Sequence, residues 1–420
     1  MGQVVSTTAC VQAGSYPVSA GVHCLPPDLT RRFKKISKEI LSDDVTDIII
    51  RVAEQGAEPN HYPHDTTKPA FSYKYMDAGW WTSGFFPGSL WLLYERSLHM
   101  PLSTSSSDIL DLALSWQEGM ESQQYNKGTH DLGFMIMPAF YRDYQLRGSN
   151  SSRDIVINAA HSLSTRWNET VQCIRSWDSM SSPRWNFSDK NKNFLVIIDN
   201  MMNLELLYRG AELTDDDELA RRATEHAKTT MAHHIRPDDS TYHLVNYNPA
   251  NGDVQGRYTV QGYADNSTWA RGQSWGVYGY TTAYKHTKDP EFLSTAKRLA
   301  TYFIKRMRET ADNTGMVYWD FDAPHTTPPI RDVSAAMVVC SGLLELYELT
   351  GDAQFLPDVA QMLEYAIWHS KAPNDADTVL RGATVNNSPD NKNPSFETGL
   401  VYADYYLLEI GNRLLQLNLA

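Results

Sequence analysis

The sequence predicts an all-α protein, a single (α/α)6 barrel with a short β-hairpin in one loop. Helical segments recur from end to end, and strand-like sequence is scarce. Some segments, such as residues 334–344, are apolar or small on every side, whereas others, such as 290–309, are apolar on one face only. This alternation is expected of a toroid with an inner and an outer ring of helices. A right-handed α-solenoid is the competing arrangement, but no repeat of about 30–45 residues is visible.

About twelve helices are predicted, and several of their ends carry chemical signals. Asp289 and Pro290 supply a cap and a favourable first helical residue. Gly210 and Gly351 follow apolar segments and predict helix ends. The approximate helical ranges, in order, are 29–54, 85–98, 106–122, 131–147, 153–166, 199–210, 216–235, 270–286, 290–309, 332–350, 353–370 and 397–416.

The remaining segments complete this plan as one domain. Residues 241–247 alternate between apolar and polar side chains, and residues 257–261 are expected to pair with them as a hairpin. The long Pro- and Asn-rich connections are of the kind that often carries function. We therefore predict one barrel domain, residues 29–420, preceded by an N-terminal extension, residues 1–28.

Charge and cysteine content exclude several classes of protein. The chain has 420 residues and a net charge of −13, which argues against a nucleic-acid binder or a polybasic membrane-surface protein. The four cysteines are spread out without a CxxC motif, so neither a disulfide framework nor a zinc site is expected. The histidine pairs at 61/64 and 233/234 lack convincing metal partners. We predict no metal and no cofactor, and the sequence leaves the oligomeric state open.

The N-terminus predicts a cytoplasmic protein. It has no apolar signal-peptide core, and no run approaches 18 apolar residues, so we expect neither a signal peptide nor a transmembrane segment. The first six residues do fit the myristoylation pattern at Gly2, with Cys10 as a second acylation candidate. Lipidation at Gly2 therefore stays open as an alternative.

Two aspartates are the strongest candidates for catalysis. Asp199 stands inside an apolar run, where a lone charge is costly unless it has a purpose. Asp131, 68 residues earlier, has similar surroundings. Each, taken alone, is more often a helix N-cap than a catalyst. In apolar surroundings, however, a carboxyl group has a raised pKa and holds a proton near neutral pH. Together they indicate an acid–base enzyme.

A third candidate pairs a cation with an aromatic ring. Arg271 and Trp275 are four residues apart and share one face of a predicted helix. A guanidinium beside an indole suits a sugar that bears a carboxylate, because one group pairs with the charge and the other stacks on the ring. A loop-capping arginine and a core tryptophan would explain the same two residues without any ligand.

In combination these segments resemble the unsaturated glucuronyl hydrolases, glycoside hydrolase family 88. The resemblance runs from about residue 70 to residue 415. Its main motifs are His-Asp-Leu-Gly-Phe at 130–134, Ile-Asp-Asn-Met-Met-Asn-Leu at 198–204 and Trp-Ala-Arg-Gly-Gln-Ser-Trp-Gly at 269–276, in this order. The segments at 81–85, 173–178, 332–336 and 399–409 also look like that family.

The resemblance implies a fold, a substrate and a mechanism. The fold is an (α/α)6 barrel, and the substrates are lyase-generated oligosaccharides with a 4,5-unsaturated uronic acid at the non-reducing end. A carboxylic acid protonates C4 of the vinyl ether, water adds at C5, and the hemiketal collapses to release the neighbouring sugar. By motif, Asp199 is that acid, and Asp131 is the second carboxylate that holds or tunes the site. The positions expected to line the sugar site are Trp81, Trp177, His243, Gln261, Arg271 and Trp275, with the polar contacts assigned to Arg271 and His243 and the stacking walls to the tryptophans.

One departure from the family pattern and three alternative functions remain at this point. Several relatives carry a histidine just before the glutamine of the segment that here reads Thr-Val-Gln-Gly at 259–262, so any contact made by that histidine is absent. The nearest alternative function is an unsaturated rhamnogalacturonyl hydrolase. From other classes, a sugar epimerase or isomerase on an α/α barrel would use histidine bases, and a catalytically dead sugar-binding protein would not need both Asp131 and Asp199.

Overall fold

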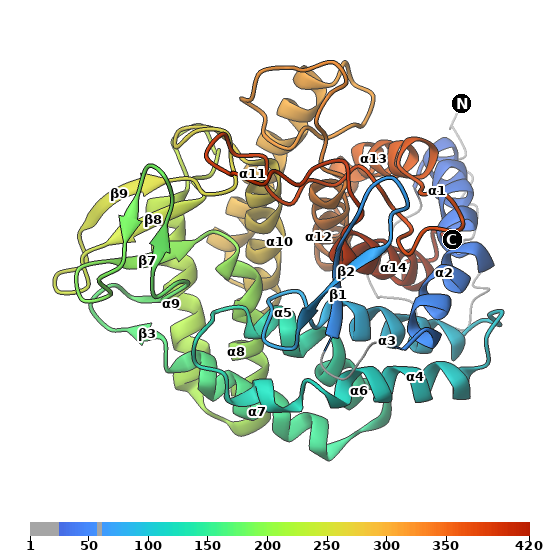
Figure 1. Cartoon of the computed structure of the whole chain (residues 1–420), viewed down its shortest axis with the longest axis horizontal. Helices are drawn as coiled ribbons and strands as arrows, with labels where there is room; N and C mark the ends of the chain where they lie inside the picture. Colours follow the sequence, from blue (N-terminus) through green and yellow to red (C-terminus); the bar gives the residue numbers. More distant parts are fainter. Residues whose placement is uncertain (1–24, 57–60) are drawn as a thin grey trace, which may run out of the picture.

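The structure is a computed structural model that describes residues 25–56 and 61–420. Most of the predicted N-terminal extension, together with Gly2 and Cys10, lies outside the described residues. In the described part, helices form two concentric rings, and short strands project from the loops (Figure 1). The predicted (α/α)6 barrel is confirmed.

The inner ring consists of six helical segments that pack side by side in a closed circle. Neighbours around the circle follow the order α3, α5 with its extension η2, α8, α10, α12, α14 and back to α3. Among them, α12 is buried on almost every side, as its sequence predicts. Their bounds are α3 Phe85–Ser97, α5 Leu132–Ile136, η2 Met137–Tyr141, α8 Asn200–Thr214, α10 Ala270–Thr287, α12 Val333–Thr350 and α14 Val401–Gln416.

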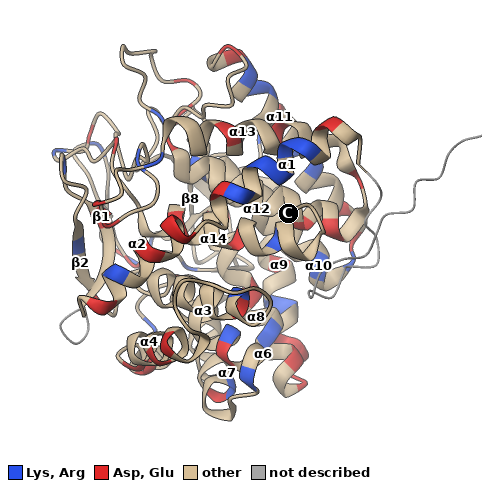
Figure 2. Ribbon diagram, turned by 90° about the vertical axis from the view of Figure 1, so that its right-hand side faces the viewer, with Lys and Arg blue, Asp and Glu red and all other residues tan. Residues whose placement is uncertain are grey.

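The outer ring alternates with the inner one along the chain. In α11, Phe292, Leu299 and Phe303 are buried against the barrel while the charged residues between them face outward, as expected of a one-sided helix. Acidic and basic residues are mixed on the outer helices visible from the side (Figure 2). The outer helices are α1 Pro27–Ile40, α2 Asp43–Glu54, α4 Ser106–Glu118, α6 Arg142–Arg147, α7 Asn150–Ser164, α9 Asp217–His234, α11 Pro290–Thr310 and α13 Leu356–His369.

Two of the predicted helices are divided in the structure, and one extends further than predicted. The range 29–54 is divided between α1 and α2. The range 131–147 is divided because Pro138, which cannot donate to an α-helical bond, follows α5 and the chain turns π-helical there. Gly210 does not end α8, which runs on to Thr214. Glycine is needed there for close packing, since a Cβ would lie 2.5 Å from that of Ala160. Gly351 does end α12, with a positive φ of 71°.

The strands form small antiparallel sheets in the loops. The predicted hairpin is confirmed in outline as β8 and β9, with Leu244 opposite Tyr258. A third strand, β7, was missed because its apolar run continues directly into a helix. The bounds are β1 His61–Thr66, β2 Tyr73–Asp77, β3 Trp167–Asn168, β4 Cys173–Ile174, β5 Met180–Ser181, β6 Asn186–Phe187, β7 Phe194–Ile197, β8 Leu244–Tyr247 and β9 Val254–Tyr258.

Helix α12 is apolar enough for a membrane by composition but belongs to the core here. In the part of the chain that the structure describes, it is one helix whose length and hydropathy would allow a membrane crossing. Inside the fold, 83% of that helix is buried by the rest of the protein. A helix at the centre of a barrel needs this composition because neighbouring helices surround it.

An aromatic partition divides the interior of the barrel across its axis. It is formed by rings whose centroids lie between 5.1 and 6.4 Å apart, and most of them are fully buried. The rings that form it are Trp81, Phe85, Phe134, Trp275, Tyr402 and Tyr406. Phe85, Phe134 and Tyr406 also line the cavity that lies on one side of the partition.

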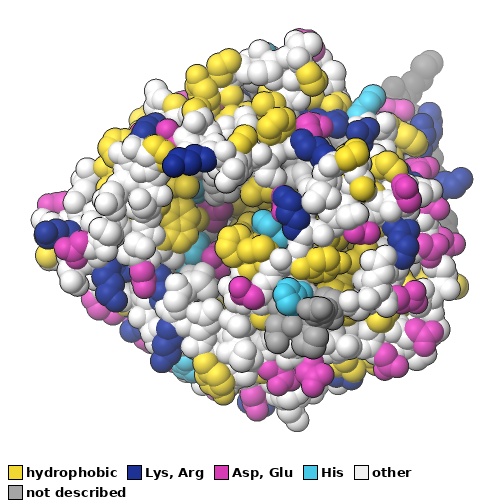
Figure 3. All heavy atoms as spheres, viewed as in Figure 1, with side chains coloured by type: hydrophobic (Ala, Val, Ile, Leu, Met, Phe, Trp, Pro, Cys, Tyr) yellow, Lys and Arg dark blue, Asp and Glu magenta, His cyan; other side chains and the backbone are white. Residues whose placement is uncertain are grey.

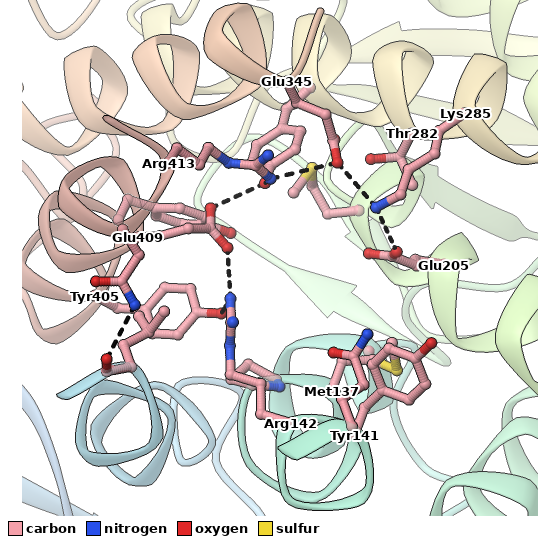
Figure 4. A pocket seen from close by; sticks show the side chains of 18 of the residues that line it. Met137, Tyr141, Arg142, Glu205, Thr282, Lys285, Glu345, Tyr405, Glu409 and Arg413 are labelled. Atoms are coloured by element: carbon pink, nitrogen blue, oxygen red, sulfur yellow. Dashed lines mark hydrogen bonds and ion pairs between the residues drawn. The ribbon is translucent and has the colours of Figure 1, made fainter. Parts of the chain in front are cut away.

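That cavity, of about 330 Å³, lies between the C-terminal halves of the inner helices and is lined by charges (Figure 4). Arg142 pairs with Glu409 at 2.9 Å, and Lys285 pairs with Glu345 at 2.9 Å and with Glu205 at 3.3 Å. Cations at helix C-termini are favoured by the negative end of the helix dipole. Because these charges are paired with one another, we interpret this charged chamber as a structural closure of the barrel.

Candidate active site

The predicted site residues gather on the other side of the partition, where the inner helices begin. Asp131 directly precedes α5, Asp199 directly precedes α8, and Arg271 lies in the first turn of α10. Trp81 lies just before α3, and Tyr402 lies in the first turn of α14. The face seen in Figure 3 is hollowed near its centre, where hydrophobic, histidine and acidic side chains come together.

Asp199 is a buried carboxyl group with an unused oxygen. Its side chain is 10% exposed, and its Oδ1 is buried without a hydrogen-bond partner among the described residues. Burial raises its pKa to about 7, and the negative charge of Asp131 also raises it, against the opposing effect of the Arg271 guanidinium. A carboxyl group of this kind holds its proton near neutral pH and can deliver it to a substrate.

Neither aspartate serves as a helix cap. Asp199 and Asp131 both occupy the N-cap position of their helices, yet neither side chain accepts a backbone hydrogen bond there. By contrast, Asp289 and Asp332 cap α11 and α12 with their side chains. The capping explanation that the sequence left open is therefore removed for Asp199 and Asp131, and the cost of burying Asp199 is not offset by a helix cap.

His243 directs a proton donor toward Asp199. The backbone N–H of Val260 donates to its Nδ1 at 3.1 Å, which assigns the ring proton to Nε2. Nε2 lies 3.7 Å from Oδ1 of Asp199 and has no hydrogen-bond partner among the described residues. Burial, and secondarily Arg271, lowers the pKa of His243 to about 3, so the ring is neutral. A neutral N–H donor and a carboxyl group thus face the same point.

Asp131 is held by two neighbours in the chain. Its Oδ2 accepts a hydrogen bond from the Thr129 hydroxyl at 2.7 Å, and its Oδ1 lies 3.3 Å from Nε2 of His130. The Asp131 side chain is 15% exposed, whereas His130 is fully buried. Asp131 is therefore a fixed carboxylate beside the more deeply buried carboxyl group of Asp199.

Arg271 is placed differently from its predicted role. It is 1% exposed, and its guanidinium donates to Asp332 at 2.5 Å, to the backbone oxygen of Thr384 and to that of Val385 at 2.7 Å. It also lies over the ring of Trp269, 4.6 Å from the centroid. These contacts leave few donors for a substrate, so in this structure Arg271 clamps the segment around residue 385 and supplies positive charge near Asp199.

The remaining predicted residues divide between the surface of the site and its floor. Trp81 and Trp177 are half-buried, and Trp177 contacts the His243 ring edge-on at 6.0 Å. Gln261 is half-buried and donates to the same Val385 oxygen that Arg271 holds, at 3.1 Å. Trp275 is fully buried in the partition, deeper than a stacking wall would lie. Its indole N–H makes no complete hydrogen bond within the described part of the chain but lies near enough to Asp199 to lower the pKa of that carboxyl group.

The helix arrangement makes this end of the barrel attractive to anions. All six inner helices direct their N-termini toward the site, and each N-terminus carries about half a positive charge from the helix dipole. This local field explains how a protein with a net charge of −13 can receive an anionic ligand. Among the described residues, no group of three or more His, Cys, Asp or Glu side chains is arranged to hold a metal ion.

Two further residues of the site were not predicted as such. Asp332 binds Arg271, and the Tyr402 hydroxyl is buried in the partition without a hydrogen bond to any described residue. Both lie in segments that the sequence marked only as resembling the family. A signal for Asp332 was available, because a charged residue directly before an entirely apolar helix needs either a cap or an ion pair, and here it has both.

Comparisons with known proteins agree with this geometry. An unsaturated glucuronyl hydrolase of Formosa agariphila is 40% identical over 332 residues, which are 78% of each chain. The chain belongs to the unsaturated glucuronyl hydrolase family. An enzyme of the same name from a Bacillus species is 31% identical over 366 residues, 84% of this chain and 91% of the relative. No family model matches the sequence.

Solved structures of the family share the architecture. A crystal structure of an unsaturated glucuronyl hydrolase specific for heparin superposes with a TM-score of 0.79 at 33% identity, covering 90% of this chain and 96% of that one. Unsaturated glucuronyl hydrolases are glycoside hydrolases, which matches the prediction of an acid–base enzyme. The comparisons support this reading and not the rhamnogalacturonyl alternative.

Proposed function

We propose that this protein removes the non-reducing-end 4,5-unsaturated uronic acid from lyase-generated oligosaccharides by hydrating its vinyl ether. The observation that carries the proposal is the Asp199 carboxyl group, buried, uncapped and with a pKa raised to about 7. Family membership supports the same substrate class. The six converging helix N-termini favour the uronate carboxylate.

Asp199 carries out both proton transfers of the proposed reaction. Protonated Asp199 transfers its proton to C4 of the C4=C5 bond, and the positive charge develops at C5 and the ring oxygen. Water adds at C5 and gives a proton back to the Asp199 carboxylate. The resulting hemiketal opens to a C5 ketone, and the former C1 acetal, now a hemiacetal, expels the neighbouring sugar as an alcohol. Asp199 is thus acid and then base in one turnover.

The surrounding groups have supporting roles in this proposal. The charge of Asp131 helps Asp199 keep its proton. The Nε2–H of His243 donates to the incoming water or to the substrate beside Asp199. Trp81 and Trp177 are half-buried at the site and supply stacking surface for the sugar. The two-carboxylate separation rule for retaining and inverting glycosidases does not apply, because the chemistry begins at the double bond.

The site geometry disfavours an isomerase or epimerase. Such enzymes need a histidine with a free basic nitrogen facing the sugar. The nitrogen of His243 that faces the site carries the proton, because its other nitrogen accepts from Val260. Burial also lowers the pKa of His243 to about 3, so it is a weak base.

The test is to incubate the protein with unsaturated disaccharides and follow the ultraviolet absorbance of the conjugated double bond. Substrates derived from hyaluronan, chondroitin, heparin, ulvan and glucuronan should be run side by side, since the sequence leaves this preference open. Loss of absorbance with release of the neighbouring sugar is expected for at least one substrate. Unchanged absorbance on every unsaturated uronide, with rearrangement of a saturated sugar, would replace the proposal by an isomerase.

A further inference from the structure

His130 is a buried histidine that the proposed reaction does not use. It directly precedes Asp131, is fully buried, and places Nε2 3.3 Å from Oδ1 of that carboxylate. Neither ring nitrogen has a complete hydrogen bond to any described group. A buried polar group without a partner costs about 1–3 kcal/mol, so its position demands a reason. The nearest acceptor with a functional role is Asp131.

The surroundings of His130 lower its pKa and place its ring near Asp131 and Asn200. Burial lowers its pKa, Asp131 raises it, and Arg166 at the end of α7 lowers it. The ring also interacts with the side chain of Asn200, the residue after Asp199. The Asn200 amide nitrogen donates to the backbone oxygen of Ile174 at 3.0 Å, which turns its oxygen toward other donors. His226 on α9 and His243 lie near enough for a positive charge on His130 to lower their pKa values.

We infer that His130 is a positioning residue that acts through Asp131. Its Nε2 lies 3.3 Å from Oδ1 of Asp131, so a small shift of the ring would complete a hydrogen bond there, while Thr129 donates to Oδ2. With a donor beside each oxygen, the Asp131 carboxylate keeps one orientation next to Asp199. Burial is the main cause of the raised pKa of Asp199, and the nearby Asp131 carboxylate adds to it. The inference rests on the proposed function, since it assigns His130 to the same reaction.

Two substitutions separate the donor from the space that the ring fills. In His130→Gln, the amide nitrogen can reach the place of Nε2. In His130→Asn, the amide nitrogen reaches only about the place of Nδ1, so the donor to Asp131 is lost while a polar amide remains. Both variants, the wild type and Asp131→Asn should be compared by kcat, KM, pH–rate profile and thermal unfolding, using the unsaturated disaccharide that the wild type consumes.

The inference predicts three results. His130→Asn lowers kcat by about tenfold to a hundredfold with KM changed by less than about threefold, because the carboxylate is misplaced. Its alkaline limb moves to lower pH, because a misplaced Asp131 carboxylate raises the pKa of Asp199 less. His130→Gln recovers most of kcat and the original limb. In the Asp131→Asn background, His130→Asn adds little further loss, since both changes remove the same interaction.

Other outcomes overturn the inference. Equal kcat in both His130 variants and the wild type would show that the donor is not used. A role in packing alone would give equal losses of kcat in His130→Gln and His130→Asn, with an unchanged pH–rate profile. Those losses would also add to the loss caused by Asp131→Asn. Failure of the proposed function is distinguishable, because the wild type itself would then leave the double bond intact in every substrate.

Discussion

Asp199→Asn is expected to abolish activity and to stabilise the protein at the same time. Asparagine has nearly the same shape but neither donates a proton to carbon nor carries a charge. General acid–base catalysis contributes about 10²–10⁴-fold, so kcat should fall by at least that factor. Stability should rise because the buried charge, which has no local partner at Oδ1, is removed.

The expected gain in stability can be calculated from the pKa of Asp199. Its pKa rises from 3.8 in the unfolded chain to about 7 in the fold, mainly through burial. The folded protein therefore binds the proton more tightly, and this stabilisation is complete below about pH 4 and lost as the pH rises through about 7. The loss amounts to about 4 kcal/mol. For a chain of 420 residues this corresponds to roughly 4–5 °C in Tm.

Thermal unfolding of both proteins between pH 4 and pH 8 measures this difference. The Tm advantage of Asp199→Asn should be small at pH 4 and should grow to roughly 4–5 °C at pH 8. A constant difference across this range, or a less stable variant at pH 8, would refute the assignment of a buried, proton-binding carboxyl group. Wild-type turnover in the variant would remove Asp199 from the mechanism.

Asp404→Asn provides a matched control. Asp404 is also buried, and burial raises its pKa to about 6. Unlike Asp199, it accepts hydrogen bonds from the backbone of Val379 and Leu380 and from the hydroxyls of Thr378 and Tyr73. An amide group there would direct N–H against donors, so this variant should lose stability at pH 8. Opposite signs at the two positions would show that hydrogen bonding, and not burial alone, decides the outcome.

Three further results are expected. The wild-type rate should fall about tenfold per pH unit above about pH 7, where Asp199 loses its proton; a flat profile up to pH 9 would contradict its role as acid. His243→Asn keeps an acceptor for the Val260 N–H but removes the Nε2 donor, so kcat/KM should fall while Tm changes little; an unchanged kcat/KM would dismiss that donor. Arg271→Lys should cost a few kcal/mol of stability and most activity, because one ammonium cannot hold Asp332 and two carbonyls together; denaturant unfolding and steady-state kinetics would show normal values if Arg271 were not a clamp.

The sequence predicted the rings of helices well because each helix carries its own periodicity. The buried α12 and the one-sided α11 could be recognised from residue pattern alone. Strand β7 could not, because a short apolar run before a helix has no period that distinguishes strand from helix. The predicted end of α8 was wrong because Gly210 allows close packing against Ala160. This contact joins two helices and leaves no signal in the local sequence.

The sequence predicted which residues belong to the candidate site but not which contacts they make there. Asp199 and Asp131 stood out through their apolar neighbours, yet only the structure shows that neither caps its helix. Arg271 was expected at the substrate, whereas its donors are taken by partners 61 to 114 residues away. Which nitrogen of His243 carries the proton depends on a loop amide at Val260. Contacts of this range follow from the assembled barrel.

The aromatic partition makes the substrate pocket a dead end. Trp81, Phe134 and Trp275 close the axis, and the charged chamber lies behind them, so a saccharide chain has no way through the barrel. Only a chain terminus can be threaded inward, one sugar at a time, and the detached keto acid then lies deeper than the shortened saccharide. The saccharide must depart first and the keto acid last. The keto acid should accordingly inhibit competitively, and the saccharide should not.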